Sequence, residues 1–69
     1  MQKEKIMLKL IEVVGASPEG FSEAVKNAVN KRLEMGEKVH FFTIVEQRGA
    51  VREGKIKEFQ VVLKIAIED

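Results

Sequence analysis

The sequence has 69 residues, of which 12 are lysine or arginine and 11 are aspartate or glutamate, with one histidine and no cysteine. This length allows a single domain, residues 1–69, whose core supplies at most about 3–5 kcal/mol. The absence of cysteine excludes disulfides and thiolate metal sites, and the near-neutral charge argues against nucleic-acid binding. Self-assembly remains as the means of stabilising so small a chain.

No stretch of the sequence is long and apolar enough to cross a bilayer, because the apolar run 6–14 is interrupted by Lys9 and Glu12. This run also lacks a small-residue cleavage site, so it makes a poor signal peptide. We therefore expect a cytoplasmic protein that has neither a membrane nor a nucleic acid among its partners.

The first half of the sequence predicts a strand followed by a helix. Residues 6–14 are rich in β-branched side chains and carry apolar residues on both faces, which indicates a strand. The segment 15–20, with two glycines and a proline, is expected to break it. From Phe21 the apolar residues recur every three or four positions, which predicts an amphipathic helix that ends just before Gly36.

The second half predicts a long β-hairpin with strands over 39–48 and 55–67. Its tip is expected at 52–55, where Gly54 supplies the positive φ that a tight turn needs. Gly49, inside the outgoing strand, indicates a bulge or a close approach to the backbone. The order strand, helix, strand, strand favours an α+β fold in which a three-stranded antiparallel sheet wraps around one helix.

Alternate residues of the return strand are apolar, which predicts that the face they share is buried. They are Phe59, Val61, Leu63, Ile65 and Ile67. On the outgoing strand Phe42 lies on one face and Phe41 on the other, so the second face of the sheet keeps apolar side chains as well. That second face needs another subunit or a flat ligand. Phe41 and Gln60 share it if the two buried faces coincide.

Five segments of the sequence match a known family in order and without an apparent gap. They are 11–17 (IEVVGAS), 22–29 (SEAVKNAV), 45–49 (VEQRG), 54–56 (GKI) and 59–64 (FQVVLK). In this order they resemble the dodecins, small flavin-binding proteins built as hollow shells of twelve subunits. The resemblance implies a β-α-β-β subunit, a hollow homododecamer, and flavin stacked between aromatic side chains near two-fold axes.

The resemblance also implies which residues hold the ligand. In the dodecins a tryptophan lies flat on the flavin ring, a glutamine binds its polar edge, and an arginine lies near a phosphate. Phe41, Gln60 and Arg48 match these three positions and are the expected flavin-binding residues. The implied function is the storage or sequestration of riboflavin or FMN, without catalysis.

Two alternatives to flavin binding remain open. Phe41 stands at the tryptophan position and covers less of a tricyclic ring than indole does, so one alternative is a structural or interaction shell without flavin. The other is a shell that binds a nucleotide cofactor such as coenzyme A. That ligand needs Arg48 to converge with lysines such as Lys55 or Lys57 after assembly.

The sequence contains no recognisable catalytic or metal-binding constellation. The single histidine, His40, has no partner motif that makes it a base for a nucleophile. Neither of the common glycine-rich phosphate loops occurs. We therefore expect no catalytic residues, no metal ligands and no enzymatic activity.

Overall fold

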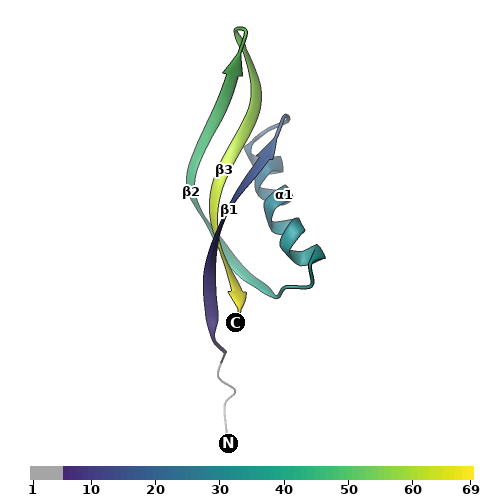
Figure 1. Cartoon of the computed structure of the whole chain (residues 1–69), viewed down its shortest axis with the longest axis vertical. Coiled ribbons are helices and arrows are strands. Elements are labelled where there is room, and N and C mark those ends of the chain that lie inside the picture. Colours follow the sequence, from purple (N-terminus) through teal and green to yellow (C-terminus); the bar gives the residue numbers. More distant parts are fainter. Residues whose placement is uncertain (1–5) are drawn as a thin grey trace, which may run out of the picture.

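The structure is a computed structural model that describes residues 6–69. Its elements are β1 (Leu8–Ser17), α1 (Phe21–Glu34), β2 (Val39–Arg52) and β3 (Lys55–Glu68). The strands form one antiparallel sheet in the order β1-β3-β2, so β3 lies in the centre (Figure 1). The predicted α+β fold with β-α-β-β order is confirmed.

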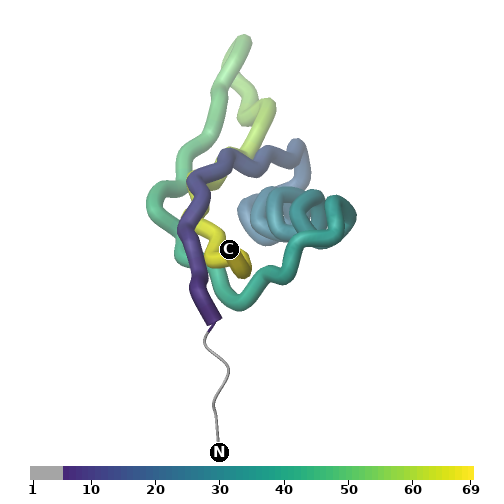
Figure 2. Tube along the Cα trace, turned by 60° about the horizontal axis from the view of Figure 1, so that its bottom comes forward, coloured from purple at the N-terminus to yellow at the C-terminus, as the bar shows by residue number. Residues whose placement is uncertain are grey.

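The helix α1 lies across the concave side of the sheet, as the view in Figure 2 shows. It begins at Phe21 and is followed by Gly36, whose φ of 84° reverses the chain, so both predicted ends are confirmed. Glu23 in its first turn and Lys31 in its last turn suit the helix dipole. No helix among residues 6–69 is long and apolar enough to cross a membrane.

The core lies between α1 and one face of the sheet. Its buried members are Ala24, Ala28, Val61, Leu63, Ile65 and Ile67. The predicted buried face of β3 is therefore confirmed for four of its five residues. The fifth, Phe59, is half-buried and meets Phe21 edge-on, with 5.0 Å between the ring centroids.

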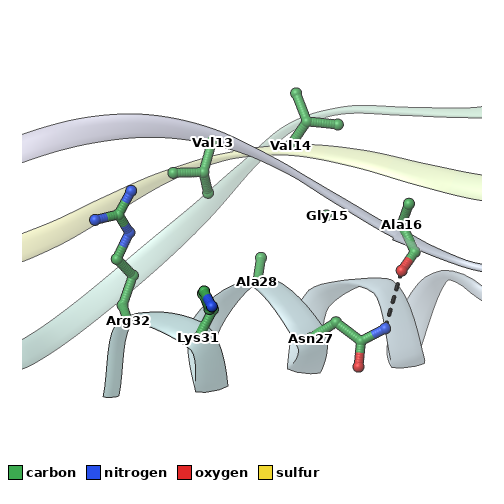
Figure 3. A pocket seen from close by; sticks show the side chains of 8 residues that line it. All are labelled: Val13, Val14, Gly15, Ala16, Asn27, Ala28, Lys31 and Arg32. Atoms are coloured by element: carbon green, nitrogen blue, oxygen red, sulfur yellow. Dashed lines mark hydrogen bonds between the residues drawn. The ribbon is translucent and has the colours of Figure 1, made fainter. Parts of the chain in front are cut away.

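The segment predicted to break the first strand is partly wrong, because β1 continues through Gly15 to Ser17. A Cβ atom at Gly15 would collide with the carbonyl oxygen of Ala24. This glycine therefore serves the close approach of α1 to the strand and not a turn. Next to it, the Asn27 side-chain amide donates a hydrogen bond of 2.9 Å to the Ala16 carbonyl oxygen (Figure 3).

The hairpin tip is confirmed, and it is a two-residue turn between the paired residues Arg52 and Lys55. Both turn residues have positive φ, 54° at Glu53 and 76° at Gly54. Positive φ at both positions is the requirement of a type I′ turn, whose twist matches that of the flanking strands. Of the two alternatives expected at Gly49, the bulge is wrong, because Gly49 pairs regularly with Phe59. The nearest atom to a Cβ at this position would be the Glu58 carbonyl oxygen at 3.5 Å, which is an ordinary contact within the chain.

Three register shifts occur elsewhere in the β2–β3 ladder, each leaving one residue unpaired. These residues are His40, Val45 and Lys57. A bulge adds one residue to one strand and does not require glycine. The shifts decide which side chains of β2 stand opposite those of β3, and they therefore decide the make-up of the site described below.

The hairpin projects well beyond α1 and the end of β1, as Figure 1 shows. The radius of gyration is 14.9 Å, whereas a compact domain of this length has about 11 Å. Near the tip, Val51 and Ile56 face each other across the strands and expose 66% and 62% of their surface. A single chain thus leaves much of its own apolar surface uncovered.

Candidate functional site

The candidate site lies on the face of the sheet opposite α1, here called the outer face. In an antiparallel sheet, directly opposed residues point to the same side. Ala66 of β3 is opposed by Leu10 on β1 and by Phe41 on β2. Ala66 is fully buried, while Leu10 and Phe41 expose 56% and 51% of their surface. A small residue is therefore flanked by two large apolar side chains.

These three residues and Leu8, which lies one rung further along β1, form an apolar platform on the outer face. Neighbouring strands lie about 4.8 Å apart, so the backbones at Leu10 and Phe41 are separated by roughly 10 Å with only a methyl group between them. A planar ring can lie on such a surface against the face of the Phe41 ring. The predicted role of Phe41 is compatible with this placement.

Charged side chains border the platform at both ends. At one end the Glu68 carboxylate lies 2.9 Å from Nε2 of His40 and 4.0 Å from Nζ of Lys38. At the other end Lys64 is flanked by Glu12 on β1 and Thr43 on β2. Charges of both signs therefore border the platform at each end.

The other two predicted ligand residues, Arg48 and Gln60, stand directly opposite each other on the outer face. Nε of Arg48 donates to Oε1 of Gln60 at 3.0 Å, and Nε2 of Gln60 donates to Glu58 at 2.8 Å. Arg48 also reaches Glu46 at 3.5 Å. These four side chains form a polar ladder in which the Gln60 amide has a fixed orientation.

The structure brings Arg48 and Gln60 together but leaves Phe41 apart from both. Gln60 lies six residues along β3 from Ala66, the partner of Phe41, which corresponds to about 20 Å. Phe41 and the Arg48–Gln60 pair nevertheless share the outer face, as the alternation predicted for Phe41 and Gln60. A site that uses both Phe41 and Gln60 therefore needs two copies of the chain.

Sequence reasoning missed Ala66, the partner of Phe41, and Leu10, which pairs with Ala66 from the other side. Counting back from the hairpin tip gives the correct partner for Phe41, because the extra residues Lys57 and Val45 lie on opposite strands and cancel. The same count places Gln47 opposite Gln60, whereas the bulge at Lys57 places Arg48 there. No local signal in the sequence marks that bulge.

Within residues 6–69, open hollows occur on the helix side of the sheet. One, of about 360 Å³, lies between β1 and α1 and is bordered by Lys31 and Arg32 (Figure 3). The other, of about 370 Å³, lies between α1 and β2 and is lined by apolar side chains that include Phe42 and Ile44. Neither contains a predicted ligand residue. Among residues 6–69 no three histidine or acidic side chains come close enough to hold a metal ion.

Nearly all of the described chain matches a known protein family. The family model described as Dodecin matches residues 7–68. A curated relative, the dodecin of Thermus thermophilus, is 35% identical over 57 residues, which is 83% of each chain.

Solved structures show the same likeness. A dodecin from Streptomyces coelicolor has a TM-score of 0.89 and 31% identity, covering 97% of this chain and 96% of that chain. A Thermus thermophilus dodecin mutant in which a tryptophan is replaced by phenylalanine has a TM-score of 0.86 and 32% identity, covering 94% and 97%. A calcium dodecin from Mycobacterium tuberculosis has a TM-score of 0.78 and 26% identity, covering 87% and 86%. The protein belongs to the dodecin family.

Proposed function

We propose that this protein is a single-domain flavin-binding dodecin that stores or sequesters riboflavin or FMN in the cytoplasm and catalyses no reaction. The observation that carries the proposal is the half-exposed ring of Phe41 beside the buried Ala66 on the outer face. An exposed aromatic ring near other exposed apolar side chains, here Leu8 and Leu10, suits a planar heterocycle. Family membership supports the same ligand class.

We propose further that the functional unit is a hollow homododecamer in which the flavin lies between Phe41 rings of two subunits. The isolated chain supports this in two ways. Its outer face exposes Leu8, Leu10, Val14 and Phe41, more apolar surface than a small monomer usually leaves to water. Its Gln60 lies about 20 Å from its own Phe41, so an amide from a neighbouring copy serves the polar edge of the ring.

The direct test is a fluorescence titration of riboflavin and of FMN with the purified protein. Stacking against Phe41 is expected to quench the flavin emission, and the end point gives the number of flavins per chain. Unchanged emission at micromolar protein would contradict the flavin proposal. The mass of the assembly, measured in parallel by light scattering, tests the shell independently of the ligand.

A shell that carries no flavin is the second candidate, and the phenylalanine at position 41 favours it. The Thermus thermophilus mutant with phenylalanine in place of tryptophan keeps the fold that this chain shares. Replacement of a tryptophan by phenylalanine is therefore compatible with the subunit fold. This candidate predicts that the protein purifies without colour and that Phe41→Ala leaves the assembly intact.

Coenzyme A or a similar nucleotide cofactor is a third ligand class. Arg52 and Lys57 line a small hollow of about 240 Å³ near the hairpin tip, together with Glu58. Binding that depends on these cations should weaken as salt is added, because salt screens exposed charges. An affinity that is independent of salt would count against this ligand.

A further inference from the structure

Lysines stand at both ends of the apolar platform, and each has a carboxylate near it. Nζ of Lys38 lies 4.0 Å from Glu68. Lys64 stands directly opposite Glu12 across the β1–β3 ladder. Lys38 is therefore not available to a ligand without first losing its carboxylate partner.

Glu68 is the carboxylate best placed to act on a ligand that lies on Phe41. It is two residues along β3 from Ala66 and lies on the outer face, about 7 Å from the centre of the platform. Its backbone amide donates to the Lys38 carbonyl oxygen at 3.1 Å, and its side chain is tied to His40 at 2.9 Å. Glu68 is therefore held at the platform's edge.

We propose that the platform selects uncharged riboflavin over flavins that bear a phosphate, and that Glu68 is the residue that sets this selectivity. The inference rests on the flavin-binding function proposed above. A phosphate monoester carries a charge of about −1.5 to −2 at pH 7. A ribityl chain that points toward the end of β3 brings the phosphate within about one Debye length of Glu68, roughly 10 Å at moderate salt, so the carboxylate repels it there.

The test compares riboflavin and FMN in fluorescence titrations of the wild-type protein and of Glu68→Gln. The titrations are made at low salt, where exposed charges are least screened. Wild-type protein is expected to bind riboflavin about tenfold more tightly than FMN. Glu68→Gln, which also releases Lys38, is expected to raise FMN affinity about tenfold and to change riboflavin affinity by less than about twofold.

A matched control is Glu34→Gln, which removes the same charge from the exposed end of α1 on the other side of the sheet. It should leave the FMN to riboflavin ratio unchanged. The inference is overturned if wild-type protein binds both flavins equally, or if Glu34→Gln raises FMN affinity as much as Glu68→Gln does. Failure of riboflavin itself to bind wild-type protein would overturn the proposed function, and this inference with it.

Discussion

At the scale of single residues, the candidate site is determined by the small side chain of Ala66 and the larger side chains on either side of it. Ala66 has no exposed surface between Leu10 and Phe41, so the exposed side chains of Leu10 and Phe41 form the surface that a ligand can meet. Gln60 and Arg48 belong to a separate polar ladder on the same face. Arg48 thus orients the Gln60 amide within the chain, a role that its expected place near a phosphate did not reveal.

Replacing Phe41 with tryptophan should strengthen flavin binding. Indole covers more of a tricyclic ring than phenyl, and aromatic stacking contributes about 1 kcal/mol, or roughly fivefold in Kd. The change is read from the same fluorescence titration. Phe42→Trp is the control, because Phe42 lies on the helix side of the sheet next to α1 and should leave the affinity unchanged. Equal effects of the two substitutions would contradict the assignment of Phe41.

Gly15→Ala should destabilise the fold, because the added methyl group would collide with the backbone carbonyl of Ala24 and crowd the side chain of Ala28. Overpacking of this kind costs about 1–3 kcal/mol. Denaturant unfolding followed by circular dichroism measures the loss. Gly20→Ala is the matched control, since nothing lies within 4 Å of a Cβ atom there and its φ of 165° is extended. A loss in Gly20→Ala as large as that in Gly15→Ala would show that the crowding at α1 is not the cause.

At the scale of elements, the β2–β3 hairpin determines the site through its turn and its bulges. The turn places Glu53 at a positive φ of 54°, a conformation that disfavours most side chains but suits asparagine and glycine. The bulges at Lys57 and Val45 then bring Arg48 opposite Gln60 and restore Phe41 to its place opposite Ala66. The hairpin therefore supports the site, and its turn contains a residue, Glu53, that is unfavourable at positive φ.

Glu53→Asn should stabilise the hairpin, because Asn-Gly is the preferred pair for this turn. A gain of about 0.5–1 kcal/mol in the free energy of unfolding is expected. Chemical denaturation compares it with Glu53→Gln, which removes the same charge but keeps a long side chain at positive φ. If both variants gain equally, the loss of charge and not the turn geometry is responsible.

At the scale of the whole molecule, a single chain is too open to be the finished structure. The hairpin extends beyond the helix, and the radius of gyration exceeds that of a compact domain of this length. Exposed apolar residues occur on the outer face and along the projecting hairpin, while the small core lies under α1. Assembly is the physical means by which such a chain covers this surface.

Val14→Glu should break up the assembly while leaving the subunit fold largely intact. Val14 exposes 58% of its surface on the outer face of the single chain, so the change costs the isolated fold little but buries a charge between copies. Light scattering is expected to report a dodecamer for wild-type protein and a smaller species for the variant. Leu33→Glu, on α1 and 49% exposed, is the comparison and should keep the wild-type mass. A wild-type monomer at micromolar concentration would contradict the shell proposal.

The sequence by itself determined the elements and the buried face. The change from a two-residue to a three-to-four-residue apolar period gave α1 from Phe21, and Gly54 with its neighbours gave the hairpin tip, because periodicity and turn chemistry are local properties. Resemblance added the family and the three candidate residues. Alternation placed Phe41 and Gln60 on one face, which the structure confirms.

Only the tertiary structure decided what lies beside those residues. The platform of Leu10, Ala66 and Phe41 joins three strands, and the bulge at Lys57 selects Arg48 over Gln47 as the partner of Gln60. Gly15 likewise belongs to a strand that packs against α1, although the glycines and proline of segment 15–20 indicated a break at this point. Register between distant segments depends on the packing of the whole sheet, so no window of the sequence contains it.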